Sequence, residues 1–340
     1  MQELSGLAAP VVVAPMAGGA STPELVAAAA SAGGLGFLAA GYATPADMVQ
    51  RVRRTRELGA EFFGVNLFVP GPDTADPVAL AAYRYRIAAD AARLGVRPGE
   101  PRWDDDAFAA KLDLLLAEPV PVVSCTFGPP PPGVADRLRR AGTLVVGTVT
   151  DAAEARLAVD AGAHALCVQG AEAGGHQGSF DDARERTAPL AEVLAAVRAA
   201  VDVPLIAAGG LTRAADVRAV LAAGATAAQL GTLFLRTPES GANPVHRAAL
   251  ADPRFTATAV TRAFTGRRAR GLVNGFLTVH DPLAPAGYPQ VHHLTAPLRA
   301  AAVRAGDAET AHLWAGTGYR AAPVEPAARV IASLTASRQS

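Results

Sequence analysis

The sequence predicts an α/β protein of the (β/α)₈ barrel class. Short apolar runs recur up to about residue 235, and each is followed by an alanine-rich stretch with the spacing of a helix. The runs lack strict apolar/polar alternation, as expected for parallel strands that are buried on both faces. Strand–helix units repeated in series indicate a closed barrel. We predict its strands at Val11–Met16, Leu35–Ala40, Phe62–Phe68, Val120–Thr126, Thr143–Val149, Ala165–Gln169, Pro204–Ala208 and Ala227–Phe234.

The joints between these elements carry the residues that end and begin helices. We expect helices to end at Gly33, Gly59 and Gly224, because each glycine stands just before a strand and accepts the left-handed conformation that follows a helix. We expect helices to begin at Thr22 and Thr44, each of which is followed by a proline and then by an acid in the first turn.

Two segments interrupt the repeating pattern. Residues from about 70 to 118 are too long for one helix, and we predict an insertion after the third strand that covers the barrel. Residues from about 236 to 340 are rich in proline and glycine up to about Pro297 and helical beyond it, and we expect a partial lid over the strand ends. Because no linker separates either segment from the barrel at about 10–235, we expect residues 1–340 to form a single domain.

The composition narrows the classes of function. The 31 basic and 31 acidic residues cancel, so no charge excess indicates nucleic acid or an anionic membrane surface, and a small-molecule partner is expected. The uncharged stretch Leu25–Ala43 is split by Gly33 and Gly34, which favours a short helix and a buried strand over a membrane span. Cys125 and Cys167 lie in apolar runs, which argues against a disulfide or a metal cluster. With no secretory signal in view, we expect a cytoplasmic protein.

The loops after the predicted strands are the places to look for chemistry, because the functional groups of such barrels sit at the carboxyl ends of the strands. Those loops are rich in glycine, which permits close approach of backbone N–H groups to a phosphate. The loops after the last two strands commonly hold a phosphate in barrels, so we predict phosphate binding by Gly209, Gly210, Gly231 and Thr232. Tight turns without a ligand are the alternative reading.

Two amides stand where an apolar strand would otherwise continue. Asn66 lies within the third strand and Gln169 ends the sixth. Each side chain offers both donors and an acceptor, which is the pattern needed to read the edge of a flavin ring. For either residue alone, capping of a loop backbone is an equally good interpretation; their shared place at the barrel rim favours the ligand.

His176 is the candidate catalytic residue. It stands in a loop of small residues, Gln169–Gly178, that cannot bury it well, and an ordinary pKa of about 6.5 suits proton transfer or a hydrogen bond to an oxyanion. A single histidine is more often structural or solvated, and that alternative stays open on the residues alone. The other histidines lack an acid or cysteine at ligand spacing, so we expect them on the surface or the lid without a metal. They are His164, His246, His280, His292, His293 and His312.

Taken together, the motifs resemble those of the nitronate monooxygenases, formerly called 2-nitropropane dioxygenases. The motifs that carry the resemblance are Ala14–Gly18, Val65–Phe68, Gln169–His176, Ala208–Gly210 and Gln229–Thr232. The resemblance extends from about Pro10 to the end of the chain, and the tail motifs Gly266–Gly271 and Leu313–Gly316 are similar to the class I branch.

The resemblance implies FMN bound without a covalent bond at the strand ends, with His176 above the flavin. The implied cofactor-binding residues are Ala14, Pro15, Met16, Asn66, Gln169, Gly174, Gly175, Gly209, Gly210, Gln229, Leu230, Gly231 and Thr232. In the family's reaction, an alkyl nitronate such as propionate 3-nitronate reacts with O₂ to give a carbonyl compound and nitrite. His176 would hydrogen-bond the nitronate oxygens, or act as a base if a neutral nitroalkane were used.

Some residues depart from the family pattern. Cys125 stands where an aromatic or small residue is expected, and the loop that follows is the stiff run Pro129–Pro132. Tyr288 and Tyr319 are candidate aromatic residues of the substrate pocket. These departures affect the choice of substrate more than the fold or the cofactor.

Other functions remain compatible with the sequence. An FMN-dependent enoyl-thioester reductase, or another NAD(P)H:acceptor oxidoreductase, would share the glycine loops but take hydride from a nicotinamide. A flavin-binding protein without turnover would have no evident need for His176. A barrel isomerase without a cofactor would use the phosphate loops but not Asn66 and Gln169.

Overall fold

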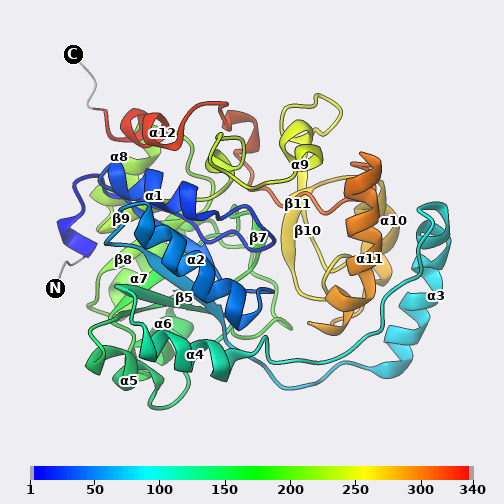
Figure 1. Cartoon of the computed structure of the whole chain (residues 1–340), viewed down its shortest axis with the longest axis horizontal. Coiled ribbons are helices and arrows are strands. Elements are labelled where there is room, and N and C mark those ends of the chain that lie inside the picture. The colour runs from blue at the N-terminus through cyan, green and yellow to red at the C-terminus, as the bar shows by residue number, and fades with distance from the viewer. Residues whose placement is uncertain (1–3, 337–340) are drawn as a thin grey trace.

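The computed structural model describes residues 4–336 and contains a closed parallel barrel of the (β/α)₈ TIM type (Figure 1). Each predicted run contains one barrel strand, so the predicted fold class is confirmed. The strands pair in chain order, and β1 closes the barrel against β9. The barrel strands are β1 (Val11–Val13), β2 (Leu35–Ala39), β3 (Gly64–Phe68), β4 (Val122–Thr126), β5 (Leu144–Val149), β6 (Ala165–Gln169), β8 (Leu205–Ala208) and β9 (Ala227–Leu230).

Both faces of these strands are buried, which explains the absence of alternation in the sequence. One set of side chains fills the interior of the barrel, and Val12, Phe37 and Ile206 belong to it. Phe37 takes the space beside β3, where a Cβ on Gly64 would lie 2.2 Å from its ring. The other set packs outward against the helices. The barrel is therefore a filled core, and its chemistry is confined to the ends of the strands.

The helices around the barrel begin and end where the capping residues predict. The side chains of Thr22 and Thr44 accept hydrogen bonds from the first turns of α1 and α2. Gly33, Gly59 and Gly224 have φ values of 79°, 84° and 93°, as their positions after helices require. The outer layer consists of α1 (Pro23–Ser31), α2 (Pro45–Glu57), α4 (Phe108–Ala117), α5 (Val134–Arg140), α6 (Ala152–Asp160), α7 (Leu190–Ala200), α8 (Ala214–Ala222) and α12 (Ala327–Thr335).

The insertion after β3 is shorter than the predicted range of 70–118. Its first helix, α3 (Pro77–Arg93), packs on α11 away from the barrel, as Figure 1 shows on the far right. Its second helix, α4, is the ordinary barrel helix after β3, because Phe108 and Leu112 share a core cluster with residues of α2. The inserted part therefore ends before α4. Both helices have apolar positions, and the sequence pattern does not show which layer each one joins.

The tail after β9 is also built differently from the prediction. It runs through η2 (Thr232–Phe234), α9 (Pro244–Ala249), β10 (Thr258–Thr261), β11 (Ala269–Leu272), α10 (Gly275–His280), η3 (Asp281–Leu283), α11 (Gln290–Ala305) and η4 (Tyr319–Ala321) before α12. A helix was expected only beyond Pro297, but α11 begins at Gln290 and contains that proline. The chain also has η1 (Leu4–Gly6), and residues 337–340 of the predicted tail lie outside the described part.

The tail forms a cover over the strand ends and then returns to the barrel. The strands β10, β11 and the two-residue β7 (Gly175–His176) form an antiparallel sheet. The last helix, α12, is not part of the cover, because it packs on α1, α8 and β1 and so serves as the eighth helix of the barrel. The expected lid thus corresponds to the segment between β9 and α12.

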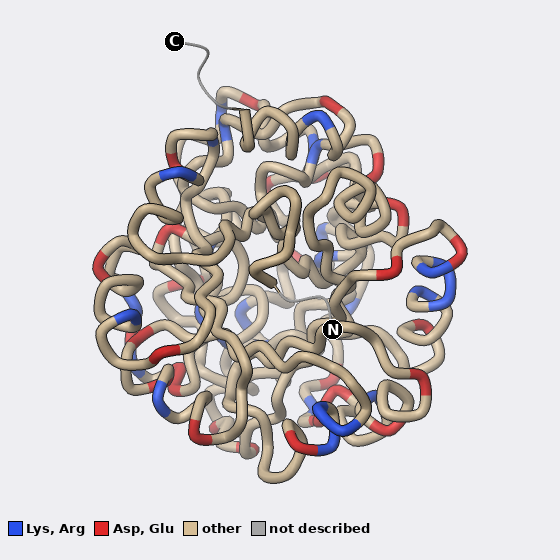
Figure 2. The backbone as a smooth tube through the Cα atoms, turned by 90° about the vertical axis from the view of Figure 1, so that its left-hand side faces the viewer, with Lys and Arg blue, Asp and Glu red and all other residues tan. Residues whose placement is uncertain are grey.

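Charged residues of both signs are interspersed around the outside of the chain, as Figure 2 shows. The formal net charge is zero. Among the described residues, no helix combines the length and the apolar character needed to cross a membrane.

Candidate active site

A cavity of about 220 Å³, here called the inner cavity, lies at the carboxyl ends of the barrel strands. All residues predicted to act in catalysis or cofactor binding line it. They are Ala14, Pro15, Met16, Asn66, Gln169, Gly174, Gly175, His176, Gly209, Gly210, Gln229, Leu230, Gly231 and Thr232. The structure thus brings together residues from loops that are more than two hundred positions apart in the chain.

One end of the inner cavity presents backbone donors. The N–H groups of Gly209, Gly210, Gly231 and Thr232 donate to no acceptor within the described residues. Gly210 is exposed and the other three residues are partly exposed, so the N–H groups are open to a ligand. Backbone donors that converge on one place without an acceptor form a concave site suited to an anion such as a phosphate. The donors come from the loops after β8 and β9, where barrels commonly hold phosphates.

Glycines let other backbone segments approach this end closely. A Cβ on Gly174 would lie 2.4 Å from the backbone nitrogen of Gly316, which belongs to the cover. Gly210 has a φ of 70°, and a Cβ there would lie 2.9 Å from Cβ of Glu172. No side chain larger than hydrogen fits at either position without displacing a neighbour.

The two predicted amides are used in different ways. The Nδ2 group of Asn66 donates to Ser124 Oγ at 2.9 Å and to Thr126 Oγ1 at 2.8 Å, while its Oδ1 atom has no donor among the described residues. Gln169 instead holds its own loop, because Nε2 donates to the carbonyl of His176 at 3.1 Å and Oε1 accepts from the N–H of Gly178 at 2.7 Å. Asn66 therefore offers a free acceptor to a ligand, whereas Gln169 chiefly braces the loop that carries His176.

His176 is fixed at one ring nitrogen and free at the other. Its Nε2 lies 2.9 Å from Thr265 Oγ1, and that hydroxyl donates to the carbonyl of Arg267 at 3.1 Å. This pattern favours a proton on Nε2, which leaves Nδ1 without a protein partner among the described residues. Rotation of the Thr265 hydroxyl toward Nε2 would allow the proton to sit on Nδ1 instead. The neutral ring can thus present either an acceptor or a donor.

The surroundings keep His176 neutral. Burial, together with the nearby charges of Arg267 and Arg299, lowers its pKa to about 3. A carboxylate that would raise this pKa is missing from the contacts of His176 that the structure describes. The ring therefore carries no charge at neutral pH.

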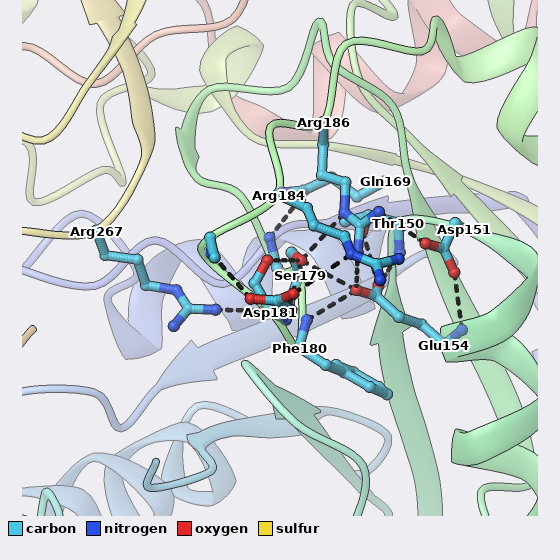
Figure 3. Close-up of polar contacts among 12 residues, drawn as sticks. Thr150, Asp151, Glu154, Gln169, Ser179, Phe180, Asp181, Arg184, Arg186 and Arg267 are labelled. Carbon is cyan, nitrogen blue, oxygen red and sulfur yellow. Dashed lines mark hydrogen bonds and ion pairs between the residues drawn. The ribbon is translucent and has the colours of Figure 1, made fainter. Parts of the chain in front are cut away.

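The loop that carries His176 is anchored on a buried carboxylate, which Figure 3 shows in close-up. Glu154 accepts hydrogen bonds from Thr150, Ser179 and the N–H of Phe180, and pairs with Arg186 at 2.8 Å. Glu154 is only 4% exposed. Nothing in the sequence distinguishes Glu154, because an acid in the first turn is common at the start of any helix.

A second cavity of about 950 Å³, here called the outer cavity, adjoins the inner one. Tyr42, Phe68 and Phe127 line both cavities. The ring of Phe127 lies 5.6 Å from the ring of His176, centroid to centroid, and 5.5 Å from that of Tyr288. The aromatic side chains thus form the boundary between the two cavities, and Tyr288 lies on it as a candidate pocket residue.

Several other predictions about single residues need correction. His246 and His312 lie in the cover, as expected of surface or lid residues, but they also line the inner cavity, and burial lowers the pKa of His246 to about 4. Tyr319 lines neither cavity, and its hydroxyl donates to the carbonyl of Phe255. Cys125 is buried and unpaired as predicted.

A filled parallel barrel with unpaired backbone donors and a neutral histidine at its strand ends is the architecture of a barrel enzyme, whose active site lies at that end of the strands. The comparisons with known proteins narrow this class. A family model described as nitronate monooxygenase matches residues 1–337. The chain therefore belongs to the nitronate monooxygenase family, whose members are oxidoreductases that depend on a flavin.

Individual relatives agree with this assignment. The chain is 34% identical to a probable nitronate monooxygenase from Staphylococcus aureus strain MSSA476, over 96% of this chain and 93% of the relative. It is 52% identical to a nitroalkane oxidase from Streptomyces ansochromogenes of known crystal structure, with a TM-score of 0.94 over 97% of this chain and 96% of that one. FabK from Thermotoga maritima is more distant, with 26% identity and a TM-score of 0.75 over 98% of this chain and 93% of the other.

Proposed function

We propose that this protein is an FMN-dependent nitronate monooxygenase that oxidises alkyl nitronates with O₂ to a carbonyl compound and nitrite. The observation that carries the proposal is the meeting, in one cavity, of the unpaired N–H groups around Gly210 with the neutral ring of His176. Membership of the family and the likeness to a nitroalkane oxidase support the same reaction class.

The residues of the inner cavity fit FMN. The N–H groups of Gly209, Gly210, Gly231 and Thr232 would hold the phosphate, since each lacks an acceptor in the described structure. The free Oδ1 of Asn66 would accept a hydrogen bond from an N–H on the edge of the flavin ring. When bound, FMN supplies the capacity to take electrons from the nitronate and pass them to O₂.

His176 would orient the nitronate without protonating it. A nitronate that gains a proton on carbon becomes a neutral nitroalkane, which is a poorer electron donor. Because the pKa of His176 is lowered to about 3, its ring at neutral pH can donate a hydrogen bond from Nδ1 but holds no second proton to transfer. In the Nδ1–H form, the Thr265 hydroxyl would turn from the carbonyl of Arg267 and donate its proton to Nε2.

The proposal is tested with purified protein loaded with FMN. Under anaerobic conditions, propionate 3-nitronate is expected to bleach the visible absorbance of the flavin, and nitrite is expected to appear after air is admitted. A protein that binds FMN but bleaches only with NADH or NADPH is instead an enoyl-thioester reductase or a related acceptor oxidoreductase. Failure to bind FMN would remove the cofactor from the proposal.

A further inference from the structure

The outer cavity contains one arginine whose charge is not neutralised by a carboxylate. Five aspartates line this cavity, and none of them pairs with Arg267 in the described part of the chain. Asp106 pairs with Lys111 at 2.7 Å and Asp182 pairs with Arg262 at 2.8 Å. The others are Asp104, which lies near Arg102, Asp181, which lies near Arg184, and Asp105, which accepts from the N–H of Ala107. Arg267 lines the same cavity and forms no ion pair within the described residues.

The guanidinium of Arg267 is held at one corner and free elsewhere. Its Nη2 donates to the backbone carbonyl of Ser179, as seen in Figure 3. Its Nε is buried and has no acceptor, and its Nη1 donates to no described residue. The plane lies over Phe127, with Cζ 4.0 Å from the ring centroid. The guanidinium is a rigid, planar group, and its unused N–H donors are suited to binding a planar carboxylate.

The free donors lie at the boundary between the two cavities. Phe127 contacts both groups, because the guanidinium lies over its ring and the ring of His176 is 5.6 Å from it in a T-shaped arrangement. Arg267 does not line the inner cavity, so it lies beyond the flavin site as we propose it. It does act on His176 through space, since its charge contributes to the lowered pKa of that ring.

A buried cation without a counter-ion is costly unless a ligand supplies the opposite charge. The backbone carbonyl of Ser179 and the ring of Phe127 provide only partial compensation. Among the acids, Asp182 has the strongest charge effect on Arg267. However, Arg262 and the N–H of Arg268 already bind Asp182. An anionic group on the substrate would satisfy both the charge and the free donors.

Building on the proposed function, we infer that Arg267 is a specificity-determining residue that binds a carboxylate on the tail of the nitronate substrate, at the boundary of the outer cavity. The substrate then carries two anionic ends: the nitronate faces His176, and the carboxylate faces Arg267. A nitronate with a neutral alkyl tail reaches His176 as well but forms no bond with the guanidinium.

The test compares two substrates in variants of Arg267. A hydrogen bond between charged groups in a buried site corresponds to roughly a ten- to hundredfold change in affinity. In the FMN-loaded enzyme, Arg267→Met is expected to lower kcat/KM for propionate 3-nitronate by that factor, mainly through KM. The value for propyl-1-nitronate should stay within about twofold. Arg267→Lys keeps the charge without the fork and should fall in between.

Arg102→Gln is the matched control. Arg102 lines the same cavity, but its side chain is 65% exposed and lies 3.8 Å from Asp104. If tail recognition depended on the general field of the outer cavity, this variant would show the same selective loss. We expect it to behave as the unsubstituted enzyme with both nitronates.

A binding measurement separates this inference from the proposed reaction. Succinate places a planar carboxylate where the nitronate would be, so it should raise the melting temperature of the unsubstituted protein and not that of Arg267→Met. Butyrate, with one neutral end, should have little effect on either. Equal loss of both nitronate activities in Arg267→Met, or no loss of either, would overturn the assignment. If the enzyme oxidises neither nitronate, the proposed function fails, and the succinate result alone decides on Arg267.

Discussion

The inner and outer cavities are adjacent but are built from different materials. The inner cavity is formed at the ends of the barrel strands, and the donors at its phosphate end are backbone N–H groups. The outer cavity is lined by side chains from the insertion and the cover, including Asp106, Arg267 and Tyr288, together with residues at the ends of the barrel strands such as Phe68 and Phe127. In the proposed function, the backbone donors would bind the cofactor phosphate, whereas side chains can change without disturbing the barrel. The difference suggests a division between cofactor binding and substrate choice.

Substitution of His176 is expected to have the largest effect and tests whether the chemistry belongs to the inner cavity. His176→Asn should lower kcat by roughly 100- to 10,000-fold, as for loss of a residue in direct contact with the reacting group. FMN content and melting temperature should remain near those of the unsubstituted protein, because Gln169 holds the loop through the backbone of residue 176. Nitrite assays with the visible spectrum measure both, and retained turnover would remove His176 from the mechanism.

Substitution of Lys111 tests how much its ion pair with Asp106, at the boundary between the cavities, contributes to stability. Lys111 is 1% exposed and pairs with Asp106, whose other oxygen accepts from the N–H of Tyr42 at 2.9 Å. Lys111→Met leaves a buried carboxylate without its cation, so stability should fall by about 3–5 kcal/mol, less if Asp106 takes up a proton. Chemical denaturation measures the loss.

The exposed pair of Arg84 with Glu100 gives the control for Lys111. These groups also lie close, at 2.6 Å, but water and salt screen them. Arg84→Gln should leave the denaturation midpoint unchanged. Similar losses in both variants would mean that the Lys111 pair has no special role at the boundary.

Substitution of Gly210 tests the cluster of backbone N–H donors in the inner cavity. In Gly210→Ala the new Cβ would lie 2.9 Å from Cβ of Glu172, at a φ of 70°. We expect a stability loss of about 1–2 kcal/mol and about tenfold weaker FMN binding. Gly59→Ala has the same strain, with a φ of 84° and no atom near the new Cβ, so it should lose stability but bind FMN normally. Titration of the apoprotein with FMN distinguishes the two.

The pH dependence of stability is the smallest expected effect. The pKa values of His176 and His246 are lowered to about 3 and about 4, so both stay neutral in the folded protein at pH 6, while the unfolded chain binds protons below about 6.5. The unfolded state then holds more protons, and stability falls as the pH drops. Between pH 7 and pH 6 each histidine should account for about 1 kcal/mol or less. Replacing His176 should reduce this sensitivity; an unchanged slope would contradict the lowered pKa.

The inner cavity was largely predictable from the sequence because its signals are local. Glycine runs after apolar strands predict backbone donors, and Asn66 is conspicuous within an apolar strand. For Gln169 the sequence left loop capping and ligand contact as alternatives, because the choice depends on where the loop folds back onto its side chain.

The outer cavity was not predictable, because it depends on contacts between residues that are distant in the sequence. Arg267 is one of many arginines in the sequence, and its free donors result from the approach of Ser179 and Phe127, which are distant in the chain. Phe127 also has a φ of 81°, a left-handed conformation that nothing in its residue type indicates. The position of α4 in the barrel and of α3 outside it was likewise decided by tertiary packing.

The place of α12 has a consequence for the synthesis of the chain. Val330, Ile331 and Leu334 belong to the same core cluster as Leu25 and Ala29 of α1. During synthesis, the residues of α1 leave the ribosome some three hundred positions before those of α12. Until α12 emerges, one apolar side of α1 faces water or a chaperone, so a protein truncated just before α12 is open to aggregation.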